Sequence, residues 1–113
     1  MVVKVKSGRL GMMGLHIGSG DVQRFFPPDV PLIELLLDHL RIVCTLEPDF
    51  WDGSPEIHDE RLDSWLALKR GSGKLASKAG LVAMIPAGEH AFRLLPIDRK
   101  EERAAKYALG FAT

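Results

Sequence analysis

The chain has 113 residues, 46% of them hydrophobic and 27% charged, a composition that predicts one globular domain and excludes a wholly disordered protein. Its net charge is zero, and it contains no apolar run near the ~20 residues that cross a bilayer. The N-terminus also lacks the apolar core of a signal peptide, so we expect a soluble cytoplasmic protein with no membrane partner.

The charges are segregated along the chain. Residues 1–28 carry four basic groups and one acid, residues 29–63 carry two basic groups and ten acids, and residues 64–113 carry nine basic groups and four acids. If the two ends of the chain come together, they form a basic face opposite an acidic one. The alternative is that these are ordinary solvated surfaces, or that the oppositely charged parts attract each other.

The N-terminal quarter predicts two strands. Val2–Lys6 has strand composition, and Leu10–Ile17 has the pattern of a strand weakened by glycine. Within the second strand, Gly11 and Gly14 indicate a bulge or a close approach of another segment. The sequence of Gly18–Asp21 then predicts a flexible loop.

The middle of the chain predicts a hairpin after an irregular segment. Phe25–Asp29 contains two prolines, which exclude regular structure, and its phenyl rings are expected to close one end of the core. Pro31–Leu46 has the leucine content of a helix but the alternation of a hairpin. We favour the hairpin, with a tight turn at Asp38-His39 and β-branched residues after it.

A helix is predicted from Ser54 to Gly71. Ser54 is expected to cap it, Pro55 to occupy its first turn, and Gly71 to end it after two basic residues. Leu81–Ile85 and Ala91–Leu95 then predict a second hairpin, with its turn at Pro86–Glu89. A short C-terminal helix is expected from Asp98.

The sequence contains no catalytic or metal-binding motif that we recognise. The four histidines lack metal-ligand spacing, the glycine-rich segments lack the residues of a nucleotide site, and Cys44 in an apolar run indicates a buried thiol. We therefore expect no metal, no cofactor and no enzymatic activity. Phe50 and Trp51, in an acidic loop, are either an anchor for a partner or side chains that fold back onto the core.

Four features of the sequence are shared with a known family. The first two are Ser7–Leu10, which precedes a strand that ends in Ile, and the Phe25–Pro27 segment. The other two are the Ile33–Thr45 hairpin, with Asp38 at its turn, and a Trp-bearing segment before the last hairpin. With the order of the expected elements, residues 4–97 resemble the DNA-binding pseudobarrel domains of plant transcription factors and of restriction-endonuclease effector domains. The resemblance implies an α+β fold, a small, mostly β pseudobarrel with one central helix. We expect one globular domain, residues 1–97, followed by a helical tail, residues 98–113.

The resemblance also implies a mode of DNA binding, in which two arms grip the major groove. The first arm corresponds to the segment with Lys6 and Arg9, which are basic as phosphate contacts require. The second corresponds to residues 49–59, which are strongly acidic and would repel a phosphate backbone. The fold can therefore be shared without the function.

Three hypotheses remain open. The first is a small DNA-binding or regulatory domain that contacts double-stranded DNA through a basic face, formed by Lys6, Arg9, Lys69, Arg70, Lys74 and Lys78. The second is a protein-interaction module or homodimer without nucleic-acid binding, in which acidic residues 47–63 meet basic residues 64–106 of another copy. The third, an enzyme, would require a cleft that gathers His16, His58 or His90 with a carboxylate.

Overall fold

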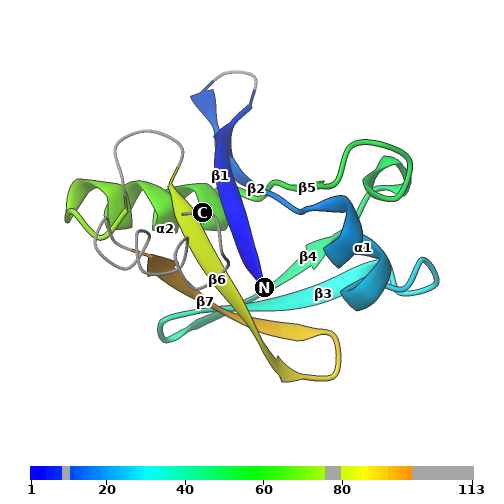
Figure 1. The fold of residues 1–113 in the computed structure, drawn as a ribbon. Coiled ribbons are helices and arrows are strands. Elements are labelled where there is room, and N and C mark those ends of the chain that lie inside the picture. The colour runs from blue at the N-terminus through cyan, green and yellow to red at the C-terminus, as the bar shows by residue number, and fades with distance from the viewer. Residues whose placement is uncertain (9–10, 76–79, 98–113) are drawn as a thin grey trace, which may run out of the picture.

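The structure is a computed structural model that describes residues 1–8, 11–75 and 80–97. Within these residues, seven strands form one sheet that is nearly closed into a barrel, and two helices accompany it (Figure 1). The expected fold class is therefore confirmed: the protein is α+β, mostly strand, and compatible with a small pseudobarrel. The helical tail expected at residues 98–113 lies outside the described residues.

Three antiparallel hairpins build the sheet, and they are β1 (Val2–Ser7) with β2 (Met13–His16), β3 (Leu32–Leu37) with β4 (Leu40–Thr45), and β6 (Leu81–Gly88) with β7 (Ala91–Ile97). β1 pairs with β6 antiparallel, β3 pairs with β7 in parallel, and a short β5 (Glu56–Ile57) adds to β2. The strand order is thus β4-β3-β7-β6-β1-β2-β5. Hairpins distant in sequence become neighbours, as the curved sheet requires.

The two predicted hairpins and the two predicted N-terminal strands are present, with two differences in detail. β2 begins at Met13 rather than at Leu10. In the last hairpin, β6 continues to Gly88 and the turn falls at Glu89-His90, where His90 has a φ of 57°. Pro86 is accommodated within the strand because the register is irregular between it and Gly88, and proline is tolerated where the ladder is interrupted.

The loop predicted at residues 18–21 was wrong, because this segment begins a helix, α1 (Ser19–Phe25). Val22 is buried in α1, and Phe26 follows it into the core with an exposed fraction of 2%. Gly20, within the first turn, disfavours a helix by about 1 kcal/mol, whereas Gly18 is the N-cap and carries no such cost. The tertiary packing of Val22 and Phe26 outweighs that local preference.

The predicted start of the second helix was also wrong. α2 spans Glu60–Gly71, and its N-cap is Asp59, whose side chain accepts a hydrogen bond from the Arg61 backbone N–H at 2.8 Å. The preceding Glu56–Ile57 pairs with β2 instead, which buries Ile57. Ser54-Pro55 and Asp59 are both plausible helix starts, and the pairing with β2 decides between them. The predicted end at Gly71 is confirmed.

α2 lies across the opening between the ends of the sheet (Figure 1). Its first turns bond to both sides: the Met13 backbone N–H donates to Asp63 Oδ1 at 2.8 Å, and Arg61 Nη2 donates to the Val43 carbonyl oxygen at 3.2 Å. Leu62, Trp65 and Leu66 are buried beneath the helix. The helix therefore completes the barrel by covering the side that the sheet leaves open.

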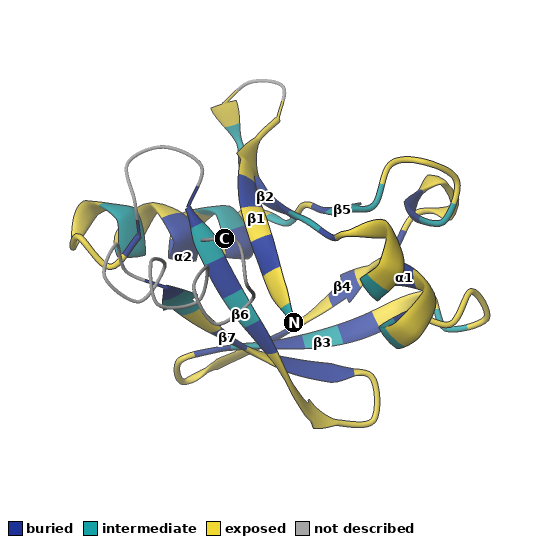
Figure 2. Ribbon diagram, viewed as in Figure 1, coloured by how far each residue is buried: buried dark blue, intermediate teal, exposed yellow. Residues whose placement is uncertain are grey.

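The core occupies the interior of the barrel. Buried and exposed residues alternate along the strands, which is the pattern of a sheet with one face toward the core (Figure 2). Phe26 stacks on Phe92 and meets Phe50 edge-on, with ring centroids 5.2 Å apart in both pairs. The expected role of the Phe25–Asp29 segment in closing one end of the core is thus confirmed for Phe26.

Candidate functional site: an acidic face around a Trp51 pocket

The predicted phosphate-binding cations are only partly brought together. Lys69, Arg70 and Lys74 lie at the C-terminal end of α2, where the Lys74 backbone N–H donates to the Lys69 carbonyl oxygen at 2.9 Å. Lys6 is exposed on β1, opposite Gly14 of β2. Arg9 and Lys78 lie outside the described residues.

Lys69 is not a free surface cation. Its Nζ lies 2.6 Å from Asp38 Oδ2, and its side chain is only 16% exposed. Hydrogen bonds from Lys69 and then from Trp65 Nε1 lower the pKa of Asp38. Arg70 is half-buried, so Lys6 and Lys74 are the exposed members of the predicted set in the described part of the chain.

Phe50 and Trp51, adjacent in the sequence, have different roles. They belong to a turn of 3-10 helix, η2 (Pro48–Phe50), and the residue after it. Phe50 is 1% exposed and packs in the core, so its ring is not an exposed anchor for a partner. Trp51 is half-buried, and its Nε1 donates to the Phe26 carbonyl oxygen at 2.8 Å. Of the two aromatic residues predicted as an anchor for a partner, only Trp51 therefore remains a candidate.

A surface pocket of about 370 Å³ lies between α1 and the loop that carries Trp51. Ile17, Val22 and Phe50 contribute apolar atoms to its lining. The polar contributors are Ser19 and Gln23 of α1, together with His16 at the end of β2. The volume lies at the lower end of the range of small-ligand sites, and the pocket is open to solvent with a lining of mixed polarity.

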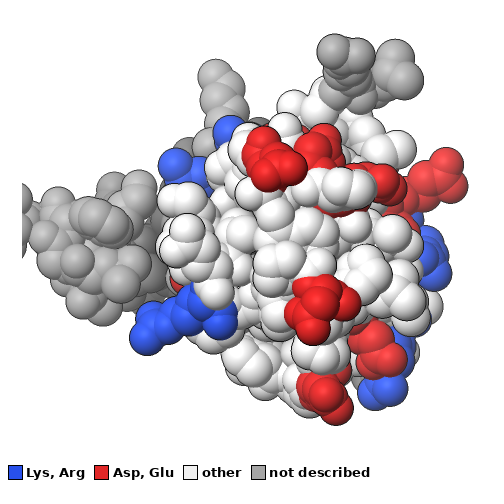
Figure 3. All heavy atoms as spheres, turned by 90° about the vertical axis from the view of Figure 1, so that its right-hand side faces the viewer, with Lys and Arg blue, Asp and Glu red and all other residues white. Residues whose placement is uncertain are grey.

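The segments around this pocket carry several carboxylates, none of which is among its lining residues. We define the acidic face by five side chains for which the described residues provide no ion pair, Asp21, Asp29, Glu47, Asp49 and Asp52. They come from α1, from the connection between α1 and β3, and from the loop between β4 and β5. Figure 3 shows acidic side chains spread over this side of the molecule, with basic groups toward its margins. Arg24 of α1 lies against the Phe25 ring, 5.8 Å from its centroid.

One wall of the pocket adjoins a cluster of two histidines and a carboxylate. His58 Nε2 lies 3.0 Å from Glu56 Oε1, and His16 Nδ1 lies 3.6 Å from Glu56 Oε2. The hydrogen bond from His58, and a weaker contribution from His16, lower the pKa of Glu56. His16 Nδ1 is buried and has no hydrogen-bond partner within the described ranges. The cluster joins β2 to β5 and positions His16 at the pocket.

Sequence reasoning missed this cluster because it placed Glu56 and His58 on a helix. On a strand, residues two apart point to the same side, so the Glu-x-His spacing is the signal that could have identified it. The structure thus gathers His16 and His58 around Glu56, and of these three residues only His16 lines the pocket. Ser19, the hydroxyl in the pocket wall, makes no hydrogen bond to His16 in the part of the chain described.

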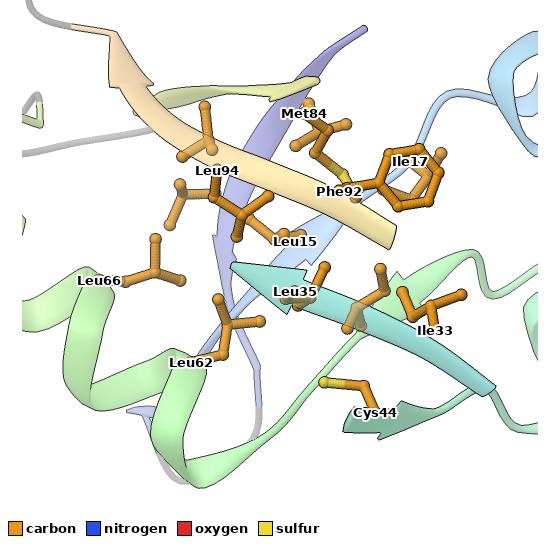
Figure 4. Close-up of a cluster of buried hydrophobic side chains, with 14 of the residues drawn as sticks. Leu15, Ile17, Ile33, Leu35, Cys44, Leu62, Leu66, Met84, Phe92 and Leu94 are labelled. Carbon is orange, nitrogen blue, oxygen red and sulfur yellow. The ribbon is translucent and has the colours of Figure 1, made fainter. Parts of the chain in front are cut away.

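Cys44 is a core residue. Figure 4 shows its side chain among the buried residues that include Leu35 and Leu62, and it is 2% exposed. Burial raises the pKa of the thiol to about 11, with a smaller contribution from the nearby Asp59 carboxylate. The interpretation of Cys44 as a buried thiol is confirmed.

No three His, Cys, Asp or Glu side chains among the described residues are arranged to hold a metal ion. None of the helices in these residues has the length and apolar character needed to cross a membrane. Comparison of the chain with family models, curated proteins and solved structures gives no match.

Proposed function

We propose that this protein is an interaction module that binds a basic segment of a partner protein through its acidic face. The carrying observation is that five carboxylates, unpaired within the described residues, lie on α1, on the connection that follows it and on the loop that carries Trp51, the segments around the Trp51 pocket. Elsewhere on the described surface, several carboxylates already have partners, as Asp38 has in Lys69 and Asp59 in Arg61. The unpaired carboxylates are therefore concentrated where a ligand can also be enclosed.

Charge complementarity favours a basic partner. Like-signed carboxylates on one face create a potential that accelerates the approach of a cationic ligand and opposes the approach of a phosphate backbone. Such interactions lie within the Debye length at moderate salt and weaken as salt is added. The half-buried Trp51 supplies the aromatic contact that dominates many protein interfaces.

The test is fluorescence anisotropy with three labelled probes: a peptide rich in lysine and arginine, an acidic peptide of equal length, and a random-sequence DNA duplex. We expect only the basic peptide to bind, with an affinity that falls as salt increases. The double variant Asp49→Asn/Asp52→Asn should weaken binding. The matched control Glu60→Gln/Glu89→Gln removes two exposed charges outside the acidic face and should leave binding unchanged. Equal loss in both variants, or no binding by the parent protein, contradicts the proposal.

DNA binding is the second candidate, favoured by the exposed Lys6 and Lys74 on a barrel-like fold compatible with the DNA-binding pseudobarrels. In the same assay it predicts binding of the duplex, with a logarithm of affinity that falls linearly with the logarithm of salt. Lys6→Glu and Lys74→Glu should each weaken duplex binding, whereas Asp49→Asn/Asp52→Asn should strengthen it. Duplex binding that is insensitive to both lysine variants would exclude this basic surface.

The expectation that the chain is not an enzyme stays a prediction. The contacts of Glu56 with His16 and His58 hold the carboxylate ionised and link two strands, which accounts for the cluster without a reaction. The interaction module remains the function that the geometry supports best.

A further inference from the structure

The walls of the Trp51 pocket are fixed by contacts within the fold. Trp51 Nε1 already donates to the Phe26 carbonyl oxygen at 2.8 Å, and the indole meets Phe50 edge-on with centroids 5.2 Å apart. Because its only N–H is occupied, Trp51 offers a ligand an apolar, electron-rich ring and no hydrogen bond. The ring is held in one orientation before any ligand arrives, which reduces the entropy cost of binding.

The other walls supply acceptors. Ser19 and Gln23 lie one helical turn apart on α1, so their side chains share a face of the helix that borders the pocket. Asp21 belongs to the same helix and Asp52 follows Trp51 in the chain, but neither carboxylate lines the pocket. Gly53, with a φ of 104°, leaves the wall beside Trp51 without a side chain. An aromatic ring and neutral acceptors therefore line one space, and the carboxylates of the acidic face lie on the segments next to it.

We propose that this pocket binds an arginine side chain of the basic partner, an inference that rests on the proposed function. A guanidinium is planar, stacks on an indole ring and presents five donors in its plane to surrounding acceptors. A lysine ammonium is a compact, strongly hydrated charge that makes a poorer stack and loses more hydration on entry. The acidic face attracts either side chain, and the pocket discriminates between them.

The experiment compares labelled peptides of equal length and equal charge whose basic residues are all arginine, all lysine or all asymmetric dimethylarginine. The methylated peptide keeps its charge but has lost donors. We expect the arginine peptide to bind wild-type protein about tenfold more tightly than the lysine peptide, with the methylated peptide between them. Trp51→Ala should reduce this preference to near unity and leave a weak, salt-sensitive affinity for both peptides.

Phe25→Ala is the matched control, since it removes a partly buried aromatic ring that does not line the pocket, and it should keep the arginine preference. If Trp51→Ala proves unfolded by circular dichroism, Gln23→Arg serves in its place. Gln23 is exposed, and an arginine there would put a cation in the pocket wall. This cation should repel the arginine of a peptide, so Gln23→Arg should also reduce the arginine preference. Equal affinity of the parent protein for arginine and lysine peptides overturns the pocket inference while the proposed function stands. Failure of every basic peptide to bind overturns both.

Discussion

Gly14 and His58 are in contact in a way that only glycine permits. A Cβ atom built on Gly14 would lie 2.4 Å from His58 Nδ1 and 2.6 Å from the carbonyl oxygen of Ile57. Both distances are far below van der Waals contact, and the second involves backbone, which cannot rotate away. Gly14 therefore lets β5 and the His58 ring approach β2, and it keeps Glu56 beside both histidines.

Gly14→Ala should destabilise the protein by about 1–3 kcal/mol, the usual cost of forcing extra volume into a packed site. The measurement is the free energy of unfolding in urea. Gly20→Ala is the control, because nothing lies within 4 Å of a Cβ at that helical position. It should be neutral or stabilise by about 0.5–1 kcal/mol. Equal stability of Gly14→Ala and wild type would show that the close approach does not occur.

The N-cap of α2 gives a second prediction, because sequence and structure assign it to different residues. Asp59→Ala should destabilise the protein by about 1 kcal/mol, since its carboxylate caps the first turn. Ser54→Ala should change the stability by less than about 0.5 kcal/mol, as expected for a surface residue that caps no helix. Urea unfolding of the two variants distinguishes the assignments. A larger loss for Ser54→Ala would restore the helix start that the sequence indicates.

Asp38 gives a prediction about pH. Its pKa in the folded state is lowered chiefly by the hydrogen bond from Lys69 and next by that from Trp65. A carboxyl group with a lowered pKa stabilises the fold above its unfolded pKa, and this stability is lost as pH falls through the folded pKa. The difference in unfolding free energy between wild type and Asp38→Asn should therefore be largest near neutral pH and shrink below about pH 4.

Lys69→Met is the control for that measurement, because it removes the main cause of the lowered pKa and keeps most of the buried side-chain volume. In a Lys69→Met background, Asp38→Asn should show a smaller pH-dependent difference. The same pH profile in both backgrounds would refute the assigned cause.

Cys44 should resist alkylation in the folded protein. The thiolate is the reactive form, and burial raises the pKa of Cys44 to about 11. At mildly alkaline pH, iodoacetamide should modify native protein at least about a hundredfold more slowly than protein unfolded in urea, followed by intact mass. Rapid modification without urea would mean that β4 opens readily.

Local patterns were sufficient to predict most of the strands. Ile33, Leu35 and Leu37 alternate with more exposed neighbours, and Asp38 accepts the positive φ of the turn, so the β3–β4 hairpin is predictable from adjacent residues. The burial of Cys44 and the end of α2 follow from local composition in the same way. These features depend on neighbours within a few residues, which a sequence displays directly.

The tertiary structure decided the rest, because the deciding contacts join residues far apart in the chain. Glu56–Ile57 is a strand because β2 pairs with it, and residues 19–25 form a helix because Val22 and Phe26 reach the core. Lys69 is lost as a surface cation because Asp38 lies beside it. The sequence by itself determined that residues 29–63 are acidic and that apolar and polar residues alternate along the strands. Only the folded arrangement brings α1 against Trp51, and that long-range packing creates the pocket.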